Sequence, residues 1–380
     1  MLNTANRFAY NEDREAFWGT VRKVLAEHIA SHLDTHESEG IVPREAWRAV
    51  GEAGMLRPTV REENGGLGLD FGFNCIVNEE LCYLGTSAGF TLQNDITVNY
   101  FERLGNEEQR QKYLPGMVTG DIITAIAMTE PGAGSDLQGV RTIAIEDGDD
   151  LIINGSKTYI TNGQNADCVI VVAKTGPSQG AKGTSLILVD AGTPGFDKGR
   201  NLDKIGQHSA DTSELFFSDC RVPKANVLGN QGRGFVHLME ELPQERLSIA
   251  VSAQAGAQRA FDEAVTFTKD RKAFGQTVFE FQNTKFTLAD LKAKLQVGWA
   301  HLDWAIKRHL AGELTTDEAS AAKLWHTDLQ WEACDKALQL HGGASYMNEY
   351  AIARLWRDAR VTRIFGGTNE IMKEVVSRSI

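Results

Sequence analysis

Two adjacent glycines near the C-terminus, Gly366 and Gly367, lie in the segment RIFGGTNEIM and form a candidate ligand-binding loop. Glycine lets the backbone approach a ligand closely, because it carries no side chain. Neither glycine is directly flanked by an acidic or basic residue. The loop could therefore supply backbone N–H groups, but a group that removes a proton must come from elsewhere in the chain.

Candidates for such a base are four glutamates: Glu240, Glu241, Glu245 and Glu370. Glu245 lies in the segment ELPQERL, at the start of a long helical pattern, and is followed by Arg246. A carboxylate buried beside a substrate has a raised pKa, which suits it to general-base catalysis. The alternative is a solvated glutamate paired with Arg246. Composition alone favours this alternative, because charged residues mostly lie on surfaces.

Two further motifs carry glycine or aromatic residues in patterns that suit a ligand. In AMTEPGAGSDL, Gly132 and Gly134 predict a turn at a strand end, which is either an ordinary turn or a nest of N–H groups. In GSKTYITNG, Tyr159 and Thr161 share one face of a strand. They belong either to an exposed strand pair or to a platform for a flat cofactor.

Basic and glycine residues also follow two of the predicted long helices. Arg271 and Lys272 stand at a helix C-terminus, where they complement the helix dipole or bind a pyrophosphate. Gly342 and Gly343 follow another helix, where a C-cap is the default explanation. The chain has no P-loop lysine motif and no GxGxxG between a strand and a helix, so a nucleotide site of those kinds is unsupported.

Three regions of different character position these motifs. Residues 1–120 read as helices, and Pro43 predicts the start of one of them. Residues 121–229 hold short Ile/Val-rich segments without long helices between them, which favours an antiparallel barrel or sandwich. Residues 230–380 return to long amphipathic helices, including an alanine seam, and predict a bundle.

Composition narrows the function further. The 380 residues include 51 acidic and 39 basic ones, and the net charge of −12 disfavours binding to a nucleic-acid backbone. No apolar run is long enough to cross a membrane, and the N-terminal segment does not read as a signal peptide. The five scattered cysteines contain no CxxC pair, so we expect a cytoplasmic protein with reduced thiols and no metal site.

Taken in series, AMTEPGAGSD, KTYITNG, RKAFG followed by a glutamine, QLHGG and GTNEI closely resemble the acyl-CoA dehydrogenase family over nearly the whole chain. ELPQERL and IFGGTNEIMKE further resemble its long-chain subgroup. The resemblance implies an N-terminal α-helical domain, a middle antiparallel β-barrel domain and a C-terminal four-helix bundle, assembled as a homotetramer. It also implies FAD-dependent conversion of an acyl-CoA to a trans-2-enoyl-CoA in lipid metabolism, with electron-transfer flavoprotein as the acceptor.

The resemblance also assigns cofactor residues. Those beside the flavin ring and the substrate would be Met128, Thr129, Gly134 and Ser135, and those covering the flavin from the β-domain would be Tyr159 and Thr161. Positions that would hold the FAD of a neighbouring subunit are Arg271, Phe274, Gln282, Gln339 and Gly343. Thr368 and Glu370 would lie beside the ribityl-pyrophosphate region. Substrate contacts are expected from Ser135, Arg246 and Gly367.

The chain departs from the family at the catalytic position. Most members carry their glutamate directly before the Gly-Thr of the C-terminal loop, and Gly366 stands there in this sequence. Gly366 keeps a backbone N–H, which we expect to donate to the thioester carbonyl. Long-chain and isovaleryl-CoA dehydrogenases carry their base at the position of Glu245, so we expect Glu245 to take the α-proton. The space at Gly366 would then admit long or branched acyl chains.

Other functions remain compatible with the same fold. An acyl-CoA oxidase would pass its electrons to oxygen, and a flavin monooxygenase would need no α-proton base. A DNA-binding relative would bind in a salt-sensitive way, although the net charge of −12 speaks against it. A purely structural homologue would hold no flavin that acyl-CoA can reduce. The identity of the acyl chain, whether fatty, branched, terpenoid or steroid, is open.

Overall fold

The computed structural model describes Arg7, residues 11–176 and residues 183–380. Its first part is helical, and Pro43 directly precedes a helix as predicted. Polar side chains fix the helix starts: Asn11 accepts a hydrogen bond from the Arg14 N–H, and Asn106 forms a capping box with Gln109. The helices are α1 (Glu12–His28), α2 (Leu33–Glu39), α3 (Arg44–Glu52), α4 (Phe71–Leu84), the π-helical turn η3 (Leu92–Thr97), α5 (Val98–Leu104) and α6 (Glu107–Thr119).

The middle part forms an 8-stranded sheet in the order β6-β7-β3-β2-β4-β5-β8, with β1 paired to β4. A hairpin at the segment EDGDD joins β2 to β3, with Gly148 at φ +63° in its turn. The strands are β1 (Thr124–Ala127), β2 (Ile143–Asp147), β3 (Asp150–Thr161), β4 (Cys168–Lys174), β5 (Thr184–Asp190), β6 (Phe196–Asn201), β7 (Thr212–Pro223) and β8 (Val227–Leu228).

The predicted middle β-domain is confirmed, and its sheet contains parallel as well as antiparallel pairs. β1 pairs with β4 in parallel, and so does the start of β2, while the other pairs are antiparallel. Parallel neighbours usually need a helical crossover, and the sequence between β1 and β4 offers no long helix. Here the β2–β3 hairpin makes the crossover instead, so the sheet is mixed.

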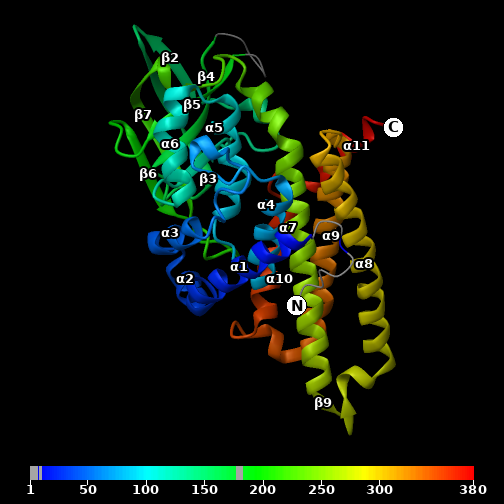
Figure 1. The fold of residues 1–380 in the computed structure, drawn as a ribbon. Coiled ribbons are helices and arrows are strands. Elements are labelled where there is room, and N and C mark those ends of the chain that lie inside the picture. Colours follow the sequence, from blue (N-terminus) through cyan, green and yellow to red (C-terminus); the bar gives the residue numbers. More distant parts are fainter. Residues whose placement is uncertain (1–6, 8–10, 177–182) are drawn as a thin grey trace.

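Alternate residues of β4 belong to two different cores. Val169 and Val171 lie in the core that the curled sheet encloses with strands β3, β5, β6 and β7. Ile170 and Val172 lie in a second core with Phe101 and other residues of α5 and α6, which cover the outer face (Figure 1). Both faces of β4 are therefore buried, which explains its uninterrupted apolar sequence.

The C-terminal part is a bundle in which α7, the longest helix, runs the full height of the molecule (Figure 1). The predicted alanine seam of α7 is buried, and Ala257, Ala260 and Ala264 share a core with Ala333 of α9. Pro243 lies inside α7, which continues beyond it to Asp270. The elements are α7 (Gly234–Asp270), β9 (Lys272–Ala273), β10 (Gln276–Thr277), α8 (Gln282–Leu310), α9 (Thr316–His341), α10 (Ala351–Thr362) and α11 (Asn369–Ser377).

Glycines in the left-handed region stand near both proposed domain boundaries. Gly120 caps α6 with φ +80°, and Gly229 follows β8 with φ +73°. Such a backbone conformation suits glycine far better than other residues. Within the described residues, no helix is both long enough and apolar enough to cross a membrane.

Candidate active site

Glu245 lies in the first third of α7 and is almost fully buried, with 5% of its surface exposed. The hydroxyl of Tyr100 on α5 donates a hydrogen bond of 3.1 Å to its Oε1 atom. Burial is the main cause that raises the pKa of Glu245 to about 7, and the charge of Glu241 adds to it; Tyr100 and Arg246 act in the opposite direction. Glu245 is thus a buried acid that titrates near neutrality.

The three other candidate glutamates are less suited to take a proton from carbon. Glu241 is also buried, but its Oε1 lies 2.5 Å from Nη1 of Arg103. The side chain of Arg103 is about half exposed, so Glu241 is held in an ion pair that points toward the surface. Glu240 is about half exposed and lies near His237. Glu370 is exposed, and hydrogen bonds at the start of α11 lower its pKa. These environments single out Glu245 among the four.

Arg246 points between α7 and α9 and is 5% exposed. Its Nη1 donates a hydrogen bond of 3.0 Å to Oγ of Ser320, and no hydrogen-bond acceptor is found for its Nε among the described residues. Burial lowers the pKa of Arg246, and the negative charge of Glu245 raises it. Arg246 therefore brings a buried positive charge beside the candidate base.

The C-terminal glycine loop meets α7 one turn beyond Glu245. Gly366 and Gly367 have φ values of +62° and +89°, so the backbone reverses through two left-handed residues. A Cβ atom added to Gly366 would overlap Cδ1 of Ile249, which stands four residues after Glu245 and on the same helix face. The expectation of free space at Gly366 is therefore wrong, because Ile249 occupies it.

A residue that the sequence analysis missed holds this loop. Lys323 of α9 has no exposed surface, and its Nζ donates to the carbonyl oxygen of Gly367 at 2.8 Å and to Oδ1 of Asn369 at 2.9 Å. Lysine is seldom fully buried, so its helical position gave no sequence signal for this contact. Only the packing of α9 under the loop brings the two together.

The turn after β1 is fixed by a buried ion pair that the sequence analysis also missed. Nζ of Lys157 lies 2.8 Å from Oε1 of Glu130 and donates to the carbonyl oxygen of Met128 at 3.1 Å. The Thr158 N–H donates to the carbonyl oxygen of Thr129 at 3.0 Å, which joins the turn to β3. The motif AMTEPGAGSD is thus built around a charge pair in the protein interior.

Several residues of the segments AMTEPGAGSDL and GSKTYITNG remain at the protein surface. Gly134 and Ser135 are exposed, and Met128, Thr129 and Thr161 are partly buried. Tyr159 has φ +60° at an irregularity of the β3–β7 pairing, and 70% of its surface is exposed. An exposed aromatic ring beside exposed backbone groups fits a flat heteroaromatic ligand.

Three family models match consecutive parts of the chain: the acyl-CoA dehydrogenase N-terminal domain over residues 11–121, the middle domain over 125–220 and the C-terminal domain over 232–380. The chain belongs to the acyl-CoA dehydrogenase family. It is therefore an FAD-dependent oxidoreductase of acyl-CoA thioesters, and its order of helical, β and helical parts is the fold of that family.

Individual relatives agree with this assignment. The chain is 46% identical to the mitochondrial long-chain specific acyl-CoA dehydrogenase of Sus scrofa over 98% of its length and 88% of that protein. It is 33% identical to the mitochondrial isovaleryl-CoA dehydrogenase of Solanum tuberosum, covering 98% and 91%. A crystal structure of acyl-CoA dehydrogenase from Geobacillus kaustophilus matches with a TM-score of 0.97 at 46% identity, covering 98% and 99%.

The remaining predicted cofactor residues of this acyl-CoA dehydrogenase divide between two places. Thr368 caps α11 next to the glycine loop, with its Oγ1 accepting a hydrogen bond from the Ile371 N–H. A second, exposed group lies at the far end of the bundle, around the β9–β10 hairpin, and comprises Arg271, Phe274, Gln282, Gln339 and Gly343.

These two groups cannot serve one ligand within a single chain. Glu245 and Asp270 are separated by 25 residues of the continuous helix α7, which corresponds to roughly 38 Å. Figure 1 shows the hairpin at the tip of the bundle, far from α11. The structure therefore brings Glu245, Arg246, Gly366, Gly367 and Thr368 into one region and keeps the hairpin group away from it.

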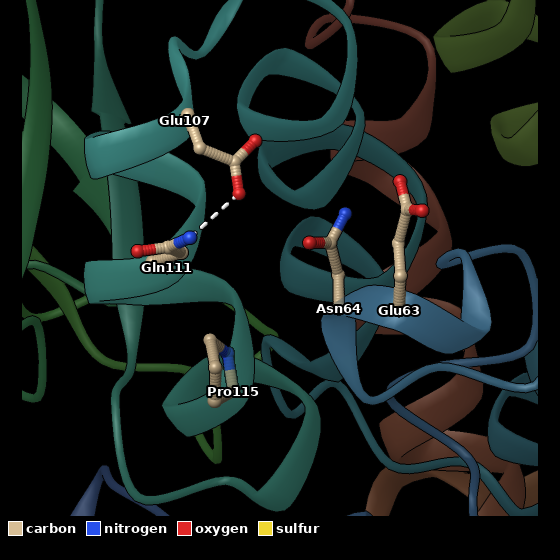
Figure 2. Close-up of a pocket in the computed structure, with 5 residues that line it drawn as sticks. All are labelled: Glu63, Asn64, Glu107, Gln111 and Pro115. Carbon is tan, nitrogen blue, oxygen red and sulfur yellow. Dashed lines mark hydrogen bonds between the residues drawn. The ribbon is translucent and has the colours of Figure 1, made fainter.

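Two surface hollows in the N-terminal part contain none of the predicted site residues. One has a volume of about 270 Å³ and lies between the segment Glu62–Asn64 and α6, where Gln111 donates a hydrogen bond to Glu107 (Figure 2). The other, of about 230 Å³, is lined by histidines and acids of the first helices. Both are separate from the region around Glu245.

Proposed function

We propose that this acyl-CoA dehydrogenase oxidises long-chain or branched acyl-CoA thioesters, with Glu245 as the base that removes the α-proton. The observation that carries the proposal is the environment of Glu245, which is buried, held by Tyr100 and has a pKa of about 7. A base is most effective when its pKa lies near the working pH, because it is then both ionised and basic. Gly366 carries no side chain that could compete for this role.

The proposed chemistry assigns a task to each group of the site. The C–H bond at the α-carbon breaks, its proton moves to the Glu245 carboxylate, and the electron pair spreads toward the thioester oxygen. The Gly366 N–H donates to that oxygen and stabilises its negative charge. Bound FAD supplies the hydride acceptor for the β-carbon. Arg246 keeps a positive charge beside the base and limits how far its pKa rises.

Several residues are proposed to hold FAD. The ring system would lie against the exposed face made by Gly134, Ser135 and Tyr159, whose exposure supports this placement. Met128, Thr129 and Thr161 would complete the contacts to the ring. Thr368 and Glu370 would face the ribityl-pyrophosphate region from the start of α11.

We further propose that the enzyme is a homotetramer, a dimer of dimers, in which the hairpin group holds the FAD of a neighbouring subunit. Phe274 is 96% exposed, which is unfavourable for an isolated aromatic side chain in water. Along α8, the exposed Phe286, Val297 and Trp304 are spaced by 11 and 7 residues and so share one face of the helix. An apolar helix face of this kind suits association with another subunit.

The proposal also covers the acyl substrate, the electron acceptor and the cellular location. The similarity to long-chain and isovaleryl-CoA dehydrogenases supports a long or branched acyl chain. We propose electron-transfer flavoprotein rather than oxygen as the acceptor. A cytoplasmic location remains a prediction from the sequence, since the relatives from Sus scrofa and Solanum tuberosum are mitochondrial proteins.

The test is anaerobic reduction of the bound flavin by a series of acyl-CoAs that differ in chain length and branching. Long or branched substrates should bleach the flavin absorbance, and Glu245→Gln should abolish bleaching while the flavin stays bound. Glu240→Gln, which changes an exposed neighbour on the same helix, is the matched control and should bleach normally. Undiminished bleaching by Glu245→Gln, or bleaching by butyryl-CoA alone, would contradict the proposal.

A further inference from the structure

The loop Gly366–Gly367 has no side chains of its own, so contacts from neighbouring elements must fix its conformation. Its flanks are tied together by the Asn369 N–H, which donates to the carbonyl oxygen of Arg363 at 3.0 Å. Two consecutive left-handed glycines have a broad range of alternative conformations. An N–H group that must point at a substrate oxygen therefore depends on additional restraints.

Lys323 supplies such a restraint from beneath the loop. Its Nζ bridges the carbonyl oxygen of Gly367 and Oδ1 of Asn369, which holds the loop to the first residue of α11. Asn369 is itself fixed, because its Nδ2 donates to Oγ1 of Thr327 and Oδ1 of Asp328, both on α9. The segment Lys323–Asp328 of α9 thus determines where the backbone of the glycine loop lies.

Burying a lysine side chain to restrain a loop is energetically unfavourable. Both acceptors of Lys323 are uncharged oxygens, and its side chain is completely buried. The charged groups that act on it are Arg246 from α7, Asp328 from its own helix, Arg363 at the end of α10 and Glu370 of α11. Burial and the charge of Arg246 lower the pKa of Lys323 to about 8.

The adjacent turn of α9 also contacts the neighbour of the base. Ser320, three residues before Lys323, accepts the hydrogen bond from Arg246, the neighbour of Glu245. Two buried cations, Arg246 next to the candidate base and Lys323 beneath the glycine loop, are therefore close enough to influence each other electrostatically. A positive potential at that place favours the negative charge that develops on the thioester oxygen.

We propose that Lys323 is a positioning residue for the dehydrogenation, which fixes the Gly366 N–H toward the thioester oxygen and stabilises the enolate by its positive charge. This inference rests on the proposed function of the site. Lys323 touches neither substrate nor base, so it acts through the backbone of Gly367 and through its charge. A merely structural lysine would affect folding and flavin binding but not the acidity of a bound substrate.

The test compares Lys323→Met with Lys336→Met, a matched control that removes a partly exposed lysine from the same helix. Acetoacetyl-CoA is the probe, because its α-protons are acidic and its enolate can be followed by near-ultraviolet absorbance. The pH at which the bound probe ionises is measured for the flavin-loaded enzymes, together with kcat, KM, flavin content and melting temperature. Bleaching of the wild-type flavin by acyl-CoA is checked first, so that failure of the proposed function is recognised separately.

In Lys323→Met we expect the acid ionisation constant of bound acetoacetyl-CoA to fall about tenfold. We expect kcat to fall about 10- to 100-fold, with KM nearly unchanged. This loss is smaller than the decrease in kcat of about 100- to 1000-fold that follows removal of an oxyanion donor itself. Lys336→Met should match the wild type. If Lys323→Met does not retain flavin, Lys323→Gln, which keeps an N–H donor, should show the same shift. Unchanged ionisation of the probe in either flavin-loaded variant, or loss of flavin from both, would overturn the inference.

Discussion

Replacing Tyr100 by phenylalanine tests the idea that one hydrogen bond tunes the base. The Tyr100 hydroxyl donates to Glu245 at 3.1 Å and stabilises the charged carboxylate, so its removal should raise the pKa of Glu245. A hydrogen bond to a charged group contributes about 1.5–3 kcal/mol, and one pKa unit corresponds to about 1.4 kcal/mol. Because this bond is long, we expect a shift of about one unit, to about pH 8.

The shift has a measurable consequence for the pH dependence of kcat/KM. At pH 7 the ionised fraction of Glu245 should fall from about one half to about one tenth, so kcat/KM should fall about fivefold. At pH 9 the carboxylate is ionised in both proteins, and the difference should nearly vanish. The assay is the pH profile of substrate-dependent flavin turnover between pH 5 and pH 10.

Tyr113→Phe is the matched control, because this buried tyrosine of α6 donates its hydrogen bond to Asp190 and not to Glu245. Its pH profile should keep the wild-type midpoint. The reasoning is refuted if Tyr100→Phe loses activity equally at all pH values, or if its acidic limb moves to lower pH.

Three further substitutions test other parts of the site. Burial raises the pKa of Glu245 in the folded state, so the wild type loses stability as the pH rises from about 4.5 to about 7 and the carboxylate ionises. Glu245→Gln should therefore be more stable than the wild type at pH 8, by up to about 3 kcal/mol in denaturant unfolding. Equal stability of the two proteins would contradict the raised pKa. Lys157→Met leaves Glu130 charged and buried; it should destabilise the protein by about 3–5 kcal/mol and lower its flavin content, and normal values for both would argue against the role of this pair. Gly366→Ala should destabilise the protein, because alanine is strained in the left-handed backbone conformation and its Cβ would overlap with Ile249. Adding Ile249→Ala to the same chain should restore part of the lost stability. Strictly additive losses of stability in the double variant would argue against the contact.

The order of helical, β and helical parts can be predicted from local patterns in the amino-acid sequence. Local patterns suffice for that, because hydrophobic periodicity, capping residues and turn glycines act over a few residues. The start of α3 at Pro43 and the β2–β3 hairpin at Gly148 are examples. The family motifs also singled out Glu245 and Gly366 by their position in the chain.

The contacts between distant segments become visible only in the folded structure. The parallel pairing of β1 with β4, the placement of Ile249 against Gly366 and the anchoring of the glycine loop by Lys323 each join residues that are 40 or more positions apart. The pKa of Glu245 likewise depends on burial and on Tyr100 from another helix. Desolvation and packing are properties of the assembled core, which is why no local pattern in the sequence encodes them.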